Sequence, residues 1–239
     1  MGRKKKMEHF REMKDFDNVY EPELKEVFDA DYKMKGRWTS DHFNNSNPLV
    51  IELGCGKGEY SLGLAKKFKH KNFIGIDIKG ARMWRGSKTA LEEGIKNVAF
   101  LRTRIEFLAS CFACNEVDEI WITFPDPQPK EKNEKKRLTS PQFIHSYLKF
   151  LKPKGLIHLK TDNQLLYEYS LKIAEEGNFQ ILDFTSDLYG EHISRMDADS
   201  QEILKIETHY ERLFKEKGHK IHYLKFIPKD GGCQSKSKE

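Results

Sequence analysis

The sequence has no run of 18 consecutive apolar residues among its 239, so it predicts no membrane-spanning helix. Its basic first residues are not followed by an apolar stretch, and they therefore do not form a secretory signal. Lys6 stands where a myristoylation motif requires Ser or Thr, which argues against a lipid anchor. We therefore expect a cytoplasmic protein that does not bind membranes.

Cysteine is also scarce, with four residues in the whole chain. Cys111 and Cys114 have the spacing of a redox or metal-binding pair, but the sequence has no second pair and no nearby histidine cluster. Two cysteines three positions apart on a helix are more often simply small apolar residues. We therefore expect no metal site.

Net charge is low at +5, yet the cationic residues are clustered. Residues 130–137 carry five cations against two acids, a local net charge of +3, and the chain begins Met-Gly-Arg-Lys-Lys-Lys. Such a local excess favours a phosphate-rich partner. The alternative for both clusters is a solvated, solubilising surface, and for residues 3–6 the two interpretations stay equally open.

The most informative segment leads into the basic run and reads FPDPQPK at 124–130. A strand-like apolar run, EIWIT at 119–123, precedes it. Three prolines stiffen the backbone around Asp126, because each ring fixes its own φ and restricts the residue before it. A rigid carboxylate at the end of a buried strand, followed by cations, suits chemistry on a polyanion; a proline-rich charged loop without function is the alternative.

Strand-like and helix-like segments alternate through the middle of the chain, which indicates an α/β fold with a parallel sheet covered on both faces. We expect strands at 49–53, 72–77, 98–101, 120–124, 156–160, 179–184 and 221–227. We expect helices at 57–68, 79–92, 105–111, from Ser140-Pro141 onward, at 164–175 and at 202–217. The predicted organisation is an N-terminal basic and aromatic arm at 1–47, one domain at 48–228 and a disordered tail at 229–239.

A glycine loop, LGCGKG at 53–58, follows the first strand and opens the first helix. Gly54, Gly56 and Gly58 permit a tight turn and let a ligand approach the backbone closely, so we predict that they bind a cofactor. Asp77 ends the second strand nineteen residues after Gly58, where a carboxylate can bind a ribose diol. Glu52 precedes the glycines and would repel a pyrophosphate but suit a cationic methionine group. The loop therefore favours S-adenosylmethionine over a nicotinamide cofactor.

Four motifs stand in one order: the glycine loop, FPDP at 124–127 with its basic continuation, KTDN at 160–163 and THYERLF at 208–214. Together they resemble the bacterial tRNA (guanine-N7)-methyltransferases over about residues 45–225. The resemblance implies a Rossmann-like S-adenosylmethionine-dependent methyltransferase fold with a mostly parallel sheet and helices on both faces. It implies methyl transfer to N7 of a guanine in the tRNA variable loop, with tRNA as the partner. No obligatory protein partner is inferred, and monomer and homodimer both remain open.

The resemblance also implies roles for individual residues. Glu52 and Asp77 match cofactor-binding positions, and Asp126 matches a residue assigned to catalysis and cofactor contact. The positions that match guanine or substrate binding are Lys130, Asp162, Thr208 and Glu211. The positions that match an RNA-contacting segment are Lys132, Asn133, Glu134, Lys135, Lys136 and Arg137.

Two positions depart from the family pattern. The usual Asp-Ala pair after the third strand is replaced by Arg104-Ile105, so we expect Arg104 to contact the cofactor through its backbone, with Glu106 as a possible side-chain substitute. The usual Trp after the second proline is replaced by Gln128, which removes a stacking group.

The proposed chemistry needs alignment and charge stabilisation more than a base, because guanine N7 already has an available lone pair. Asp126 can orient the reactants, while Glu211 and Asp162 can accept from the N1–H and N2–H donors of guanine. Without a function, Glu211 would be a helix-surface residue and Asp162 a helix cap. A nicotinamide oxidoreductase and a catalytically silent RNA-binding module are the competing interpretations; the former does not explain the motifs after residue 124.

Overall fold

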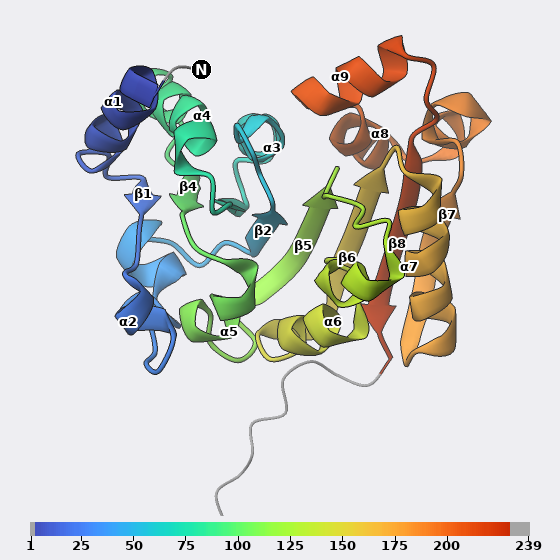
Figure 1. Cartoon of the computed structure of the whole chain (residues 1–239), viewed down its shortest axis with the longest axis horizontal. Helices are drawn as coiled ribbons and strands as arrows, with labels where there is room; N and C mark the ends of the chain where they lie inside the picture. The colour runs from blue at the N-terminus through green and yellow to red at the C-terminus, as the bar shows by residue number, and fades with distance from the viewer. Residues whose placement is uncertain (1–2, 230–239) are drawn as a thin grey trace, which may run out of the picture. The chain divides into compact units, whose positions relative to one another are not determined.

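The computed structural model describes residues 3–229, with side chains from residue 6 onward. The chain divides into two compact units, Met1–Phe112 and Ala113–Glu239. Each unit is built on its own set of neighbouring strands (Figure 1). From residue 230 onward, the predicted disordered tail lies outside the described residues.

Parallel strands form the centre of the first unit, in the order β1-β4-β3-β2. These are β1 (Val19–Tyr20), β2 (Leu49–Leu53), β3 (Asn72–Ile76) and β4 (Val98–Leu101). Every residue of β2, β3 and β4 is buried, as continuous apolar runs predict for parallel strands that are covered on both faces. The predicted strands at 49–53 and 98–101 match β2 and β4, and that at 72–77 ends one residue beyond β3.

Helices connect and cover these strands. They are α1 (Arg3–Met13), α2 (Leu24–Val27), the π-helical turn η1 (Trp38–His42), α3 (Glu59–Lys67), α4 (Gly80–Glu92), the 3₁₀ turn η2 (Ile105–Phe107) and α5 (Leu108–Cys111). Helix α3 is three residues shorter than the expected helix at 57–68: the glycine turn occupies the first two of them, and Phe68 is the C-cap. Helix α3 packs on β2 and β3, and α4 packs on β4.

The N-terminal segment packs closely on the first unit. Helix α1 lies beside α4 (Figure 1), where His9 stacks on Trp84 with ring centroids 3.7 Å apart. Strand β1 extends the parallel strands beside β4, and the fully buried Trp38 donates its indole N–H to the Cys111 carbonyl at 2.9 Å. Tyr32 and Trp38 of this arm are therefore core residues, whereas Phe28 is exposed, and the domain boundary at residue 47 stays a prediction.

Strands of the second unit have the order β5-β6-β8-β7. They are β5 (Val117–Thr123), β6 (Leu151–Thr161), β7 (Phe179–Thr185) and β8 (His222–Pro228). Strands β5 and β6 are parallel, whereas β8 runs antiparallel to both β6 and β7. The last strand of the described residues, β8, therefore lies between the earlier β6 and β7.

Helical segments of the second unit connect these strands. They are η3 (Glu131–Lys136), α6 (Pro141–Tyr147), α7 (Gln164–Glu176), η4 (Leu188–His192), η5 (Ile193–Arg195), α8 (Ala198–Leu204) and α9 (His209–Glu216). Helix α7 packs along β6, β7 and β8, and its buried residues include Leu166, Ser170 and Ala174.

The expectation of one helix over 202–217 is wrong. The chain forms two helices there, because α8 ends at Leu204 and α9 begins at His209. Thr208 is the N-cap of α9, and its hydroxyl oxygen accepts from the Glu211 N–H at 3.1 Å. At the end of α8 and just after it, the carbonyls of Leu204 and Ile206 accept from the ammonium of a buried lysine, Lys160.

No helix in the described part of the chain, residues 3–229, has both the length and the apolar character needed to cross a membrane.

Candidate functional site

The glycine loop of the first unit follows β2 and opens α3. Gly54, Gly56 and Gly58 have φ values of 74°, 56° and 74°, a left-handed conformation that costs glycine little. The amides of Gly54 and Cys55 both donate to the Ile76 carbonyl, at 2.8 and 3.0 Å. The loop is therefore fixed to the end of β3, and its shape depends on the glycines.

Two of these glycines border open space, whereas the third is packed. A Cβ added at Gly54 would meet nothing within 4 Å, and one at Gly56 would meet only the Gly54 carbonyl at 4.0 Å. A Cβ at Gly58 would lie 2.5 Å from the Phe100 ring. Gly58 thus serves packing, while the backbone at Gly54 and Gly56 can be approached closely by a ligand.

One carboxylate binds the helix after the glycine loop and another binds the loop itself. Glu52, buried at the end of β2, accepts from the Ser61 N–H at 2.9 Å and also from the Ser61 hydroxyl. Asp77 accepts from the Gly56 N–H at 2.9 Å and from the Lys79 N–H at 2.8 Å. Each oxygen of Asp77 has a second lone pair, so Asp77 can order the loop and still accept from a ribose hydroxyl.

Cys55 lies within the loop but does not have the properties of a nucleophile. Its side chain is buried. Burial, followed by the charges of Glu52 and Asp77, raises the pKa of the Cys55 thiol well above its ordinary value. The thiol therefore stays protonated at neutral pH and acts as a small packing group.

Arg104 follows β4 and its side chain is exposed. The guanidinium lies 3.3 Å from the Glu106 carboxylate, in an ion pair between two side chains that are both largely exposed. Arg104 is also the residue before η2, with an extended backbone. A backbone contact to a cofactor at this position stays a prediction, and the structure offers no special side-chain geometry for it.

Asp126 stands between two strained residues of the second unit. Phe124 and Gln128 both have a φ of 47°, an uncommon conformation for residues other than glycine. The Phe124 N–H donates to the Lys160 carbonyl at 2.8 Å, and Asp126 Oδ1 accepts from the Gln128 N–H at 3.3 Å. The carboxylate is exposed at the tip of this turn, and the strain at its two sides could not be read from the prolines.

The basic run at 130–137 contains the 3₁₀ helix η3, with Lys130 and Arg137 as its flanking caps, and it has two kinds of cation. Lys130, Lys132, Lys135 and Lys136 are exposed, whereas Arg137 is 6% exposed. The Arg137 guanidinium lies over the Tyr169 ring at 4.4 Å and donates to the Gln128 carbonyl at 3.3 Å. Arg137 therefore fixes the turn that carries Asp126, in addition to any contact with RNA.

Asp162 is not a helix cap. The residue after it, Asn163, caps α7 by accepting from the Leu166 N–H at 2.9 Å. Asp162 Oδ2 instead lies 3.5 Å from His219 Nδ1, and the Asp162 side chain keeps 17% of its surface exposed. Helix capping, the alternative role for Asp162, is therefore carried out by Asn163 instead.

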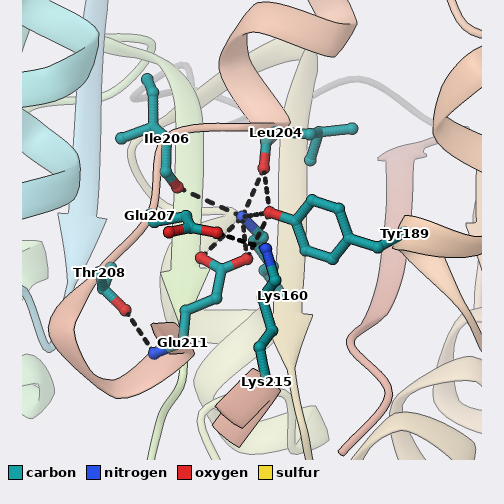
Figure 2. A network of polar contacts seen from close by, with 8 residues as sticks. All are labelled: Lys160, Tyr189, Leu204, Ile206, Glu207, Thr208, Glu211 and Lys215. Atoms are coloured by element: carbon teal, nitrogen blue, oxygen red, sulfur yellow. Dashed lines mark hydrogen bonds and ion pairs between the residues drawn. The ribbon is translucent and has the colours of Figure 1, made fainter. Parts of the chain in front are cut away.

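Glu211 lies in the first turn of α9 but is fully buried, so it is not a helix-surface residue. Figure 2 shows its carboxylate against the ammonium group of Lys160, which is also fully buried. Glu211 Oε1 lies 2.8 Å from Lys160 Nζ and accepts from the Tyr189 hydroxyl at 2.6 Å; Oε2 accepts from Lys160 at 2.9 Å. Direct binding of guanine by Glu211 stays a prediction, and both oxygens already have partners.

Burial governs the titration of this network. It lowers the pKa of the Lys160 ammonium, an effect that the nearby Glu211 opposes. It raises the pKa of the Tyr189 phenol, and the charge of Glu211 acts in the same direction. Lys160 and Tyr189 were not among the predicted site residues. The available signal was the lysine at the end of an otherwise apolar strand, LIHLK at 156–160.

Within the described residues there is no group of three or more His, Cys, Asp or Glu side chains placed to hold a metal ion.

Comparison with known proteins adds the family. A family model described as "Putative methyltransferase" matches residues 46–224. The tRNA (guanine-N(7)-)-methyltransferase of Christiangramia forsetii is 48% identical over 226 residues, covering 95% of this chain and 99% of that protein. The protein of the same name from Bacteroides thetaiotaomicron is 45% identical over 232 residues, covering 97% and 89%.

Solved structures support the fold at much lower sequence identity. The 16S rRNA methyltransferase KamB is 14% identical with a TM-score of 0.56, covering 76% of this chain and 88% of that one. A 16S rRNA (adenine(1408)-N(1))-methyltransferase from Catenulisporales acidiphilia, solved with its cosubstrate, has a TM-score of 0.51 at 14% identity and covers 82% and 91%. The predicted Rossmann-like methyltransferase fold with a mostly parallel sheet is thereby confirmed.

Proposed function

The chain belongs to the tRNA (guanine-N7)-methyltransferase family, and from this premise we propose that it transfers a methyl group from S-adenosylmethionine to N7 of a guanine in the variable loop of tRNA. The observation that carries the proposal is the agreement along nearly the whole chain with relatives of that name. The glycine loop, the exposed Asp126 and the exposed lysines of η3 supply the binding groups that this reaction needs.

The residues of the first unit fit an adenosyl cofactor. S-adenosylmethionine supplies a methyl group that is activated on a sulfonium. The open backbone at Gly54 and Gly56 lets a ligand approach closely, and Asp77 retains lone pairs for a ribose diol. The negative charge of Glu52 suits the cationic methionine group and opposes a pyrophosphate.

Asp126 acts as an orienting and charge-stabilising group. Because guanine N7 carries its own lone pair, no proton has to be removed before attack, and positive charge develops on the purine. A carboxylate that is already held in place stabilises this charge without reorganising during the reaction. The strained residues on both sides of Asp126, and Arg137 beneath Gln128, supply the required rigidity.

We assign the reading of guanine to Asp162 in the first place, since its carboxylate is partly exposed and accepts hydrogen bonds only. The exposed lysines at 130, 132, 135 and 136 bind tRNA phosphates, and these contacts position the RNA without reading its sequence.

The purified full-length chain is expected to methylate unmodified tRNA in the presence of S-adenosylmethionine. Nucleoside mass spectrometry of the digested tRNA should detect 7-methylguanosine, and fragment mapping should place it in the variable loop. Methylation of another base or another atom, or none on any tRNA, would contradict the proposal.

Asp77→Ala should weaken S-adenosylmethionine binding by about 1–3 kcal/mol, as expected for the loss of a charged hydrogen bond. Isothermal titration calorimetry measures this directly. Asp118→Ala is a matched control, because Asp118 belongs to the other unit, where it pairs with Lys152. Tight NADH binding without any binding of the adenosyl cofactor would overturn the cofactor assignment.

Asp126→Asn should lower the methylation rate at saturating tRNA by about 10²–10³, the cost of losing one preorganised electrostatic group. The amide oxygen can still accept from the Gln128 N–H, so the turn is preserved while the charge is lost. Calorimetry should show nearly unchanged cofactor affinity. A variant with near-normal turnover would reduce Asp126 to a residue of the turn.

Neutralising the three exposed lysines together, as Lys132→Gln, Lys135→Gln and Lys136→Gln, should weaken tRNA binding and flatten its salt dependence. The negative slope of log K against log salt should become shallower by roughly 0.7–0.9 for each lysine that no longer neutralises a phosphate. Binding is measured by fluorescence anisotropy over a salt series.

Arg137→Gln is the comparison for this triple variant. Because Arg137 is buried over Tyr169, its loss should lower the midpoint of thermal unfolding, with less effect on the salt slope than the triple variant has. An unchanged slope in the triple variant would show that the run is only a solvated surface.

A further inference from the structure

A buried lysine at the end of β6 organises the segment that leads into α9. Lys160 is fully buried, and in the sheet it lies opposite Thr123 on one side and Tyr223 on the other. An ammonium group in such a place loses its hydration, so it must be paired and hydrogen-bonded to remain charged. Its partners therefore define what it does.

Those partners come largely from one stretch of chain, which we call the 204–211 segment. Lys160 Nζ donates to the Leu204 carbonyl at 2.6 Å and to the Ile206 carbonyl at 3.3 Å, and it pairs with the Glu211 carboxylate (Figure 2). The Leu204 carbonyl lies at the end of α8, where carbonyl groups lack helical partners, and the Ile206 carbonyl lies in the connection that follows. One ammonium thus links the end of α8, the connection and the first turn of α9 to β6.

Further contacts support the same segment from the side of η4. The Tyr189 hydroxyl donates to Glu211, and the Lys215 ammonium lies 3.9 Å from the centre of the Tyr189 ring. Lys215 also pairs with Glu207 inside the 204–211 segment. Figure 2 shows these groups converging around Lys160.

Glu211 cannot bind a base without losing its contacts with Lys160 and Tyr189. Its carboxylate has no exposed surface, and each oxygen accepts from Lys160. Moving Glu211 to guanine would leave Lys160 buried without an anion, and breaking a buried pair in this way is strongly unfavourable. Asp162 lies two residues beyond Lys160 and retains exposed surface, so it can accept from a base while the pair stays intact.

We propose that Lys160 is a positioning residue for the substrate-binding segment, and that Glu211 acts on guanine recognition only through Lys160. The ion pair holds the 204–211 segment, including Thr208, in the conformation that receives the substrate. Asp162 is the group that distinguishes guanine from purines without the N2 amine. The inference rests on the proposed function.

The test compares Lys160→Met, Glu211→Gln and the double variant on tRNA with guanine or inosine at the target position. If the pair acts as one unit, each single change raises the KM for tRNA about tenfold or more. The double variant should be no worse than the worse single variant, because contacting residues are coupled. The KM for S-adenosylmethionine should stay unchanged in all three.

The ratio of guanine to inosine methylation separates positioning from direct contact. The ratio should persist in the Lys160 and Glu211 variants and collapse in Asp162→Asn, which replaces an acceptor-only carboxylate. A ratio lost in Glu211→Gln but kept in Lys160→Met would show that Glu211 contacts the base and would overturn the proposal. So would an unchanged KM for tRNA in both single variants.

Two further variants keep the test decisive if Lys160→Met does not fold. Tyr189→Phe removes one neutral donor to Glu211 and leaves the ion pair, so it should raise the KM for tRNA only two- to fivefold. Lys172→Met is the matched control, because the Lys172 ammonium forms an exposed pair with Glu176 in the same unit. Its KM should equal that of the wild type.

Hydrogen exchange tests the positioning role without any activity. Lys160→Met should speed amide exchange in the 204–211 segment while α7 stays protected. Wild-type protein that forms no 7-methylguanosine would refute the proposed function and leave this measurement valid. Unchanged exchange in the 204–211 segment would refute the positioning role even if the methylation assay succeeds.

Discussion

In each unit, the residues that carry chemistry are placed by the ends of buried parallel strands. The glycine loop follows β2, Asp77 follows β3 and Arg104 comes shortly after β4. In the second unit the strained turn with Asp126 follows β5, and Asp162 follows β6. Strands that are buried on both faces cannot shift in register without exposing apolar side chains, so their ends are fixed positions. Short polar loops can therefore be held precisely enough for binding, and the usual location of ligands in α/β folds is beyond the carboxyl ends of the strands.

The dependence of the binding loops on buried strand ends explains which features could be predicted from the sequence. The apolar runs of β2 and β4 and the glycines after β2 report local constraints, because burial and backbone conformation act on neighbouring residues. The broken helix at 202–217 has one local signal, Thr208 as the N-cap of α9, and one distant contact that the sequence does not show. The distant contact comes from Lys160, more than forty residues earlier, whose ammonium donates to the carbonyls of Leu204 and Ile206. The hydrophobic periodicity over 202–217 does not report that distant partner. It favours a single helix, and this expectation is wrong.

The same limit applies to charged side chains in the predicted site. Charge alone does not reveal whether a side chain is solvated: Lys136 and Arg137 are neighbours in one basic run, yet only Arg137 is buried against an aromatic ring. Asp162 and Asn163 are also neighbours, and it is the amide that caps α7. In both pairs one member has a structural contact, which is tertiary for Arg137 and local for Asn163, while the other keeps exposed surface. A motif matched as a whole therefore contains residues with different physical roles, which only the contacts can separate.

The buried pair between Lys160 and Glu211 fixes conformation more than it adds stability. Replacing a buried ion pair by apolar residues is often neutral or stabilising, so the pair is weak evidence for stability as such. An apolar replacement could not donate to the Ile206 carbonyl, and it would leave the Leu204 carbonyl with only the Tyr189 hydroxyl as a donor. The amine satisfies them, and Glu211 balances its charge from the first turn of α9. The pair thus selects one conformation of the connection between α8 and α9 among the many that a short connection could adopt. A segment that is already ordered matters most where it must bind a substrate, since ordering it during binding would reduce affinity.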